Sequence, residues 1–192
     1  MIRGAIAALL LLALPCAAAE SPFRSGVLEP PSPAQDFTLR TDEGKPFRLH
    51  DWLGSVVLLY FGYTSCPDVC PTTLAEFAQV KKQLGPAAQR LRVALVTVDP
   101  ERDTPKRLRT YTRVFDSTFL GLTGSRDTLA SVWKAYGVYV QSHRVPGSSV
   151  GYGVDHSATT FVIDANGNLR LAIPFGTSVE DIRHDLQLLL TR

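Results

Sequence analysis

An unbroken apolar run, VVLLYF at residues 56–61, limits the folds open to this chain. Such a run is typical of a strand buried on both faces, as in the centre of an α/β sheet. A second run, VALVTV at residues 93–98, has the same character. Between the two runs, apolar residues recur at near-helical spacing until Gly85 and Pro86 end the pattern: Leu74, Phe77, Val80 and Leu84. The sequence therefore predicts a β-α-β unit.

Capping and turn residues divide the rest of the chain. Three signals mark helix starts: Thr104 with Pro105, Ser125, and Thr177 with Glu180 as a capping box. Asn166-Gly167 predicts a hairpin between strands at residues 159–163 and 169–173. The expected order is a short hairpin at residues 37–49, βαβα, an extra helix, a loop or small hairpin at residues 141–153, and ββα. One α/β domain over residues 36–192 accounts for this order.

The first 19 residues predict export. Arg3 gives a short positive region, residues 5–14 are apolar, and Ala17 to Ala19 offer a small-residue cleavage site. Two other fates stay open. One is lipidation at Cys16, which the preceding proline disfavours. The other is retention as an anchor, for which the apolar stretch of residues 4–19 falls short of the ~20 residues that span a bilayer comfortably.

The segment after the export signal predicts a linker. Residues 20–35 contain four prolines, at positions 22, 30, 31 and 33, which would hold the domain away from the export segment or a membrane. The whole chain has 20 basic and 18 acidic residues, a formal charge of +2, and no basic stripe. This balance argues against a nucleic-acid partner.

Cys66 and Cys70 lie where the first buried strand meets its helix, in the sequence CPDVCP. Open α/β sheets place their sites at the carboxyl ends of strands. Backbone N–H groups and the positive end of the helix stabilise a thiolate there, which lowers the pKa of a thiol. The spacing lets the two sulfurs close a disulfide or hold one ion from two sides. A purely structural disulfide is the alternative, although so short a loop removes little entropy from the unfolded chain.

A histidine beside two thiolates would complete a trigonal site for Cu(I), or with a further donor a site for Cu(II) or Zn(II). His156 is the strongest of four candidates because it follows the Gly-rich segment and directly precedes the strand at residue 159. His50 and His184 are expected at the surface, and His143 would need loop motion to reach the site. From the residues alone, His156 as a ligand competes with a loop histidine bonded to the backbone.

Three segments in this order resemble the Sco/SenC family: YFGYTSCPDVCPTTL at residues 60–74, VDPERDTP at residues 98–105 and VDHSA at residues 154–158. The resemblance implies a thioredoxin-like three-layer fold with an N-terminal β-hairpin and an extra helix and loop as an insertion. Members are copper chaperones, usually membrane-tethered, that help to assemble the binuclear copper centre of cytochrome c oxidase. Carried over by position, the resemblance makes Cys66, Cys70 and His156 the copper ligands.

The resemblance thus implies an exported metallochaperone, in the periplasm or on the outer face of the inner membrane. It would carry one copper ion, as Cu(I) or Cu(II), from an upstream donor to the copper-binding oxidase subunit, as a monomer and without enzymatic activity. The alternative is a thiol-disulfide oxidoreductase that reduces the cysteines of that oxidase site, with Cys66 attacking and Cys70 resolving. A thiol peroxidase ranks last because no arginine stands close to the cysteines in sequence.

Four aspartates near these motifs have simpler expected roles. Asp155 is predicted to orient the His156 imidazole, with a turn-forming role as the alternative. Asp68 is expected in the first turn of the helix. Asp99 and Asp103 are interpreted as turn and cap residues around their neighbouring prolines, with a contact to the partner as the alternative.

Overall fold

The computed structural model describes residues 21–146 and 151–191. The export signal expected at residues 1–19, with Cys16, lies outside the described residues and stays a prediction. Within the described ranges, no helix is both long enough and apolar enough to cross a membrane.

The first apolar run is strand β4, Val56–Gly62, and each of its seven residues is buried. Helix α1, Val69–Leu84, follows it and leads through a 3-10 turn to strand β5, Leu91–Thr97. β5 pairs with β4 in parallel along its whole length. The predicted β-α-β unit is confirmed. Because both strands are apolar on both faces, the sheet needs cover from a layer on each side.

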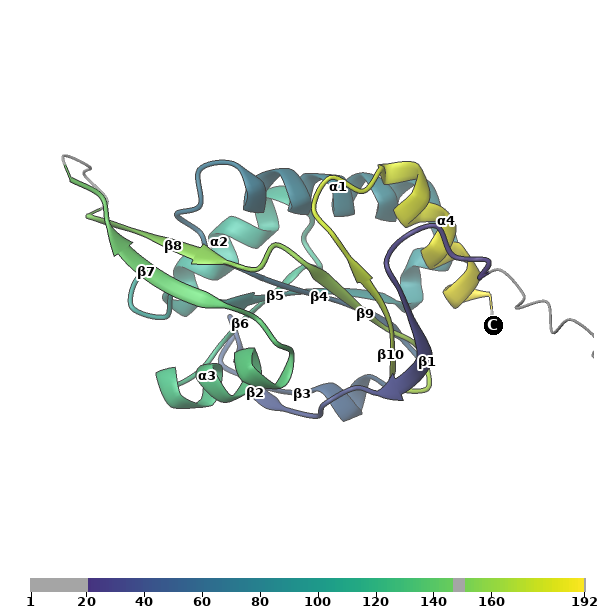
Figure 1. The fold of residues 1–192 in the computed structure, drawn as a ribbon, viewed down its shortest axis with the longest axis horizontal. Helices are drawn as coiled ribbons and strands as arrows, with labels where there is room; N and C mark the ends of the chain where they lie inside the picture. The colour runs from purple at the N-terminus through teal and green to yellow at the C-terminus, as the bar shows by residue number, and fades with distance from the viewer. Residues whose placement is uncertain (1–20, 147–150, 192) are drawn as a thin grey trace, which may run out of the picture.

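Eight strands form one sheet in the order β1-β10-β9-β4-β5-β6-β2-β3 (Figure 1). The two hairpins predicted at its flanks are confirmed: β2, Thr38–Thr41, with β3, Pro46–Arg48, and β9, Thr160–Ile163, with β10, Asn168–Ile173. Strand β6, Leu120–Thr123, extends the sheet beyond β5 and is absent from the sequence prediction. With four residues, β6 is too short to show the alternation of apolar and polar residues that predicts a strand.

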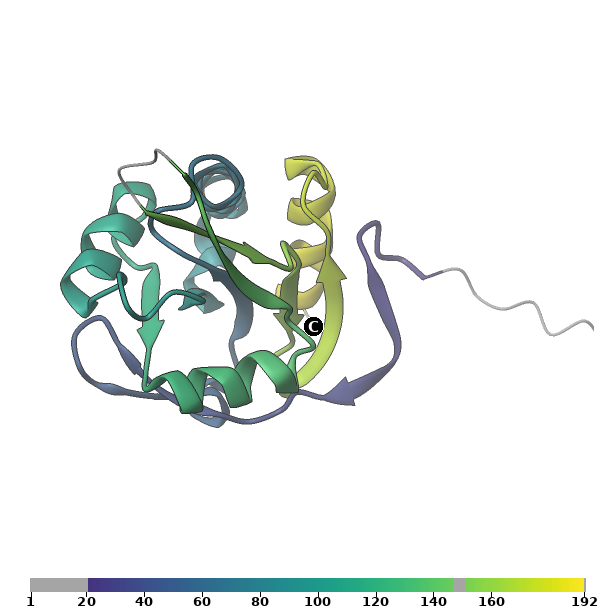
Figure 2. The same ribbon diagram turned by 60° about the vertical axis from the view of Figure 1, so that its left-hand side comes forward.

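The helices lie in two layers. Figures 1 and 2 show α1, α2 (Pro105–Phe115) and α4 (Val179–Leu190) on one face of the sheet and α3 (Arg126–Ala135) on the other. The crossovers β4-α1-β5 and β5-α2-β6 run in the same direction across the sheet, and right-handed crossovers of that kind place their helices on one face. The predicted three-layer α/β fold is confirmed.

Two of the three predicted helix caps are confirmed and one is shifted. Thr104 accepts a hydrogen bond from the Arg107 N–H, and Ser125 accepts one from the Thr128 N–H. The last cap is Ser178, not Thr177, and its hydroxyl accepts from the Asp181 N–H at 3.1 Å. The sequence TSVED contains two overlapping capping patterns, which local chemistry does not distinguish.

The expected linker of residues 20–35 is wrong in part. Residues 27–33 form strand β1, Val27–Pro33, which pairs antiparallel with β10 at the edge of the sheet. Prolines are tolerated there because an edge strand needs backbone N–H donors on one side only. The folded domain therefore begins before residue 36.

A buried carboxylate fastens the segment in front of β1. Asp185 of α4 is fully buried and accepts hydrogen bonds from the backbone N–H groups of Arg24 and Ser25 at 2.8 to 3.1 Å. We expect Asp185→Ala to lower the free energy of unfolding by about 1–3 kcal/mol, because two backbone donors lose a charged acceptor. Urea denaturation of the reduced protein measures this loss. Asp127→Ala, on the exposed first turn of α3, is the control and should cost less than about 0.5 kcal/mol; equal losses would contradict the role of Asp185.

Candidate metal centre

Cys70 has a fixed place against the central strand. It is the second residue of α1 and is fully buried. The Tyr60 hydroxyl donates to its Sγ at 3.3 Å. Gly62 leaves the space that this sulfur fills, because a Cβ at that position would lie 2.9 Å from Cys70 Sγ. Strand β4 thus holds one thiol rigidly at its carboxyl end.

Cys66 lies in the turn before α1 and is partly exposed. The Cys70 N–H points at its Sγ across 3.4 Å, and both cysteines are free thiols. The pKa of Cys66 is lowered to about 4, chiefly by the hydrogen bond from the Cys70 thiol, against the opposing effect of burial. The backbone of Cys70 and Asp68 lowers this pKa further. The lowered pKa expected of the thiols at this helix start is therefore found for Cys66 and not for Cys70.

Cys70 has the opposite protonation behaviour. The pKa of its thiol is raised far above the usual range, first by its hydrogen bond to Cys66 and then by burial. One proton therefore stays on Cys70 while Cys66 carries the charge. The pair offers an exposed thiolate beside a buried thiol.

His156 ends strand β8, Tyr152–His156, which pairs with β7, Val140–Arg144. Of the two forms expected for residues 141–153, a loop or a small hairpin, the structure has the hairpin, which brings the Nε2 of His156 to 3.6 Å from Cys70 Sγ. Nδ1 lies 3.1 Å from the Ser157 carbonyl oxygen, which can only accept, so Nδ1 carries the proton and the Nε2 lone pair is left for a ligand. The edges of Tyr60 and Tyr63 pack around the ring, with centroids 6.4 and 5.8 Å away.

These three side chains form one group. The two Sγ atoms and the histidine nitrogen all lie within 4.8 Å of one another. The other histidines lie elsewhere: His50 is exposed, His143 pairs with Asp155 at 3.0 Å, and His184 contacts Asp185 at 2.9 Å. Two soft sulfurs and one imidazole nitrogen at this separation can close on a single metal ion.

The predicted role of Asp155 is wrong. Its exposed carboxylate contacts His143, and the Ser157 carbonyl orients the His156 ring in its place. Successive side chains of a strand point to opposite faces, so Asp155 faces away from the side on which His156 meets the cysteines. This alternation was available from the sequence once residues 152–156 were recognised as a strand.

The comparisons with known proteins agree with this geometry. A model of the SCO1/SenC family matches residues 27–191. The chain belongs to the SCO1/SenC family. The apo Sco1 protein of Thermus thermophilus, solved in solution, is 39% identical with a TM-score of 0.78, covering 90% of this chain and 99% of that one. Both the predicted family and its thioredoxin-like fold are confirmed.

Two further SCO1/SenC relatives extend the comparison. ScoI of Bradyrhizobium japonicum, solved with copper bound, is 33% identical with a TM-score of 0.74, covering 82% of this chain and 99% of that one. The SCO2-like protein of Rickettsia felis is 36% identical over 132 residues. That match covers 69% of this chain and 64% of the relative, so the chain spans less than two thirds of that relative's length.

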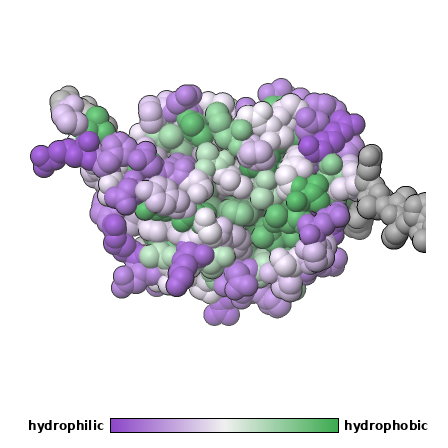
Figure 3. All heavy atoms as spheres, viewed as in Figure 1, coloured by the Kyte–Doolittle hydropathy of each residue, from purple (hydrophilic) through white to green (hydrophobic). Residues whose placement is uncertain are grey.

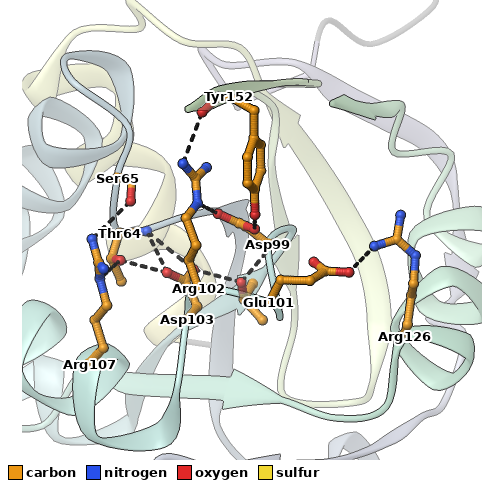
Figure 4. Close-up of polar contacts among 10 residues, drawn as sticks. Thr64, Ser65, Asp99, Glu101, Arg102, Asp103, Arg107, Arg126 and Tyr152 are labelled. Atoms are coloured by element: carbon orange, nitrogen blue, oxygen red, sulfur yellow. Dashed lines mark hydrogen bonds and ion pairs between the residues drawn. The ribbon is translucent and has the colours of Figure 1, made fainter. Parts of the chain in front are cut away.

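In this SCO1/SenC protein Asp103 supports the cysteine loop through hydrogen bonds. Its fully buried carboxylate accepts from the Thr64 hydroxyl at 2.6 Å, the Thr64 N–H at 3.2 Å and the Thr97 hydroxyl at 2.7 Å (Figure 4). Burial raises the pKa of Asp103 despite these bonds. Asp99 is also buried and bonds Arg102 and Tyr152. Reading both aspartates only as turn and cap residues missed this support.

An arginine also lies beside the cysteine loop. Arg107 of α2 donates from Nε to Thr64 Oγ1 at 2.7 Å and from Nη2 to Ser65 Oγ at 2.9 Å (Figure 4). No arginine stands close to the cysteines in sequence, but the fold brings one to the cysteine loop. The sequence did not reveal this neighbour because Arg107 is distant along the chain and approaches through the packing of α2.

The thiol asymmetry predicts a specific pH profile. Because the pKa of Cys66 is about 4, its thiolate persists at neutral and mildly acidic pH. In the reduced, metal-free protein, alkylation of Cys66 by iodoacetamide should be nearly independent of pH above about pH 5 and should slow below it, while Cys70 stays unmodified. Mass spectrometry of quenched samples measures both rates. The urea-denatured chain is the control, where rates should rise through about pH 8.5; the same rise in the folded protein would contradict the assignment.

Proposed function

We propose that this protein is an extracytoplasmic copper metallochaperone. It binds one copper ion through Cys66, Cys70 and His156 and delivers it to the binuclear copper site of cytochrome c oxidase. The observation that carries the proposal is the grouping of two sulfurs and one imidazole nitrogen within 4.8 Å. Thiolate sulfur selects Cu(I), and the copper-bound relative from Bradyrhizobium japonicum supports copper as the ion.

The three ligands differ in mobility, which suits transfer. Cys70 is buried in the core, Cys66 lies in a turn and is partly exposed, and His156 belongs to a hairpin outside the main sheet. An incoming thiolate from the oxidase subunit can reach the copper from the exposed side. In the proposed exchange, His156 leaves first, Cys66 second and the buried Cys70 last. An upstream donor loads the site by the reverse order.

The location of this activity is part of the proposal. Residues 1–19 would export the chain, so that the domain works in the periplasm or on the outer face of the inner membrane. The domain would act as a monomer there, either free or tethered through its N-terminal segment.

A thiol-disulfide reductase is the second candidate, and the unequal thiols favour it. The Cys66 thiolate would attack one sulfur of a substrate disulfide, forming a mixed disulfide and releasing the other substrate sulfur as a thiolate. Cys70 would then give its proton to the substrate thiolate already released and attack the Cys66 sulfur, which breaks the mixed disulfide and releases the second substrate thiolate. The Cys66–Cys70 disulfide is the oxidised product. This reaction gives His156 no required part.

Copper binding by the reduced protein tests the first proposal. Under anaerobic conditions, native mass spectrometry should show one Cu(I) per chain. Competition with a chromophoric Cu(I) chelator should show that His156→Ala weakens the affinity by about 10-fold or more, because a ligand is lost. His50→Ala is the matched control and should bind as the unaltered protein does. Reduced protein that takes up no copper would refute the chaperone.

Reduction of a disulfide-bonded peptide distinguishes the reductase from the copper chaperone. A reductase should act on the peptide at similar rates with and without His156→Ala, and should lose the reaction in Cys66→Ser. Copper binding that depends on His156, together with negligible peptide reduction, would remove this candidate.

A further inference from the structure

The hairpin that carries His156 has little apolar support. β7 and β8 form a separate two-stranded sheet, which projects beyond the body of the protein in Figure 1. Of the residues in these two strands, Val154 is the one that is buried. The hairpin is mostly hydrophilic in Figure 3. Between it and the body lies a cavity of about 520 Å³, lined in part by Trp133 and Val140. Packing alone therefore places this hairpin weakly.

Three polar residues attach the hairpin to the body: Asp99, Arg102 and Tyr152, which we call the clamp (Figure 4). The Tyr152 hydroxyl donates to the Asp99 carboxylate at 2.6 Å. Arg102 donates from Nη1 to the Tyr152 carbonyl at 2.9 Å and from Nε to Asp99. The Arg102 guanidinium also lies 3.7 Å from the centre of the Tyr152 ring. The Asp99 side chain is 1% exposed and that of Arg102 16%, so water competes little for these contacts.

The clamp acts on the face of β8 that holds the metal ligand. Tyr152, Val154 and His156 alternate along one strand, so their side chains share a face. Fixing the strand at Tyr152 therefore fixes the direction in which His156 points. The backbone N–H of Val154 donates to the hydroxyl oxygen of Tyr63, whose ring packs against His156, and this bond is a further contact between β8 and the body.

One turn contacts both the loop that carries the cysteines and the hairpin that carries His156. Asp103 binds the cysteine loop through Thr64, and Asp99 binds the hairpin through Tyr152. The two carboxylates are four residues apart, in the turn between β5 and α2. The same short turn therefore contacts both the cysteine loop and the hairpin.

We propose that the clamp of Asp99, Arg102 and Tyr152 positions His156 against the cysteines, and that its opening withdraws the imidazole from the metal while both sulfurs stay in place. The inference rests on the proposed function, since it names the element that controls the third ligand. With the clamp closed the ion has three ligands. With the clamp open it has two, and an incoming ligand can enter the vacated position.

Clamp variants test this inference through copper affinity. Tyr152→Phe keeps the ring and removes the bond to Asp99, and Asp99→Asn removes the charge that holds Arg102. Each should weaken Cu(I) binding by about 10-fold. Glu101→Gln is the matched control, because Glu101 lies on the same turn but its carboxylate pairs with Arg126 of α3 (Figure 4). Its affinity should be unchanged.

A double-mutant cycle shows whether the clamp acts through His156. If it does, Tyr152→Phe has no further effect on copper affinity in a protein that already carries His156→Ala. If the two losses add, the clamp supports the fold in general, and the inference is overturned.

Hydrogen exchange of the metal-free protein gives a readout that does not need copper. In Tyr152→Phe, amides of residues 152–156 should exchange faster, while those of residues 69–75 in α1 keep their rates. Unchanged exchange in the hairpin would overturn the inference even if copper binds. If the unaltered protein binds no copper, the proposed function fails, and so does control of a metal ligand. Exchange then reports only whether the clamp holds the hairpin.

Discussion

The site depends first on the burial of the Cys70 sulfur against strand β4. Tyr60 donates to this sulfur and Gly62 makes room for it, so moving Cys70 would disturb the core of the sheet. The other two ligands are brought to this fixed point, Cys66 by the turn before α1 and His156 by a hairpin. The centre therefore has one rigid member and two members on elements that can adjust. Under the proposed function, this combination lets the centre hold an ion and later release it.

The unequal environments of the two thiols explain why two functions compete. Cys66 holds the negative charge because Cys70 donates a hydrogen bond to it, while burial keeps the proton on Cys70. A thiolate beside a reserve thiol serves disulfide exchange as well as metal binding. The imidazole favours metal binding, in line with the proposed function. Disulfide exchange does not need a nitrogen ligand, yet Nε2 of His156 lies 3.6 Å from Cys70 Sγ.

The sequence predicts those parts that follow from local pattern. Strands β4 and β5 are continuous apolar runs, and the cysteines stand at the join of a strand and a helix. Strand β1 was missed because its prolines are typical of linkers and its partner, β10, is distant in the chain. Arg107 was missed because its contact with Thr64 arises from the packing of α2. Asp155 was misassigned because residues 154–156 had not been assigned to a strand, so the alternation of side chains was not applied.

The turn at residues 99–103 shows how a site can be prepared before any ion arrives. Burying two carboxylates is costly unless each finds partners. Asp103 finds them in the cysteine loop, and Asp99 finds them in Arg102 and the Tyr152 hydroxyl. Asp103 has its full set of partners when the cysteine loop is in place, and Asp99 when the hairpin is in place. Folding this turn therefore favours the arrangement in which the thiols and the imidazole meet at the same edge of the sheet. Under the proposed function, an arriving copper ion then meets ligands that are already ordered, and the entropy of ordering them does not weaken its binding.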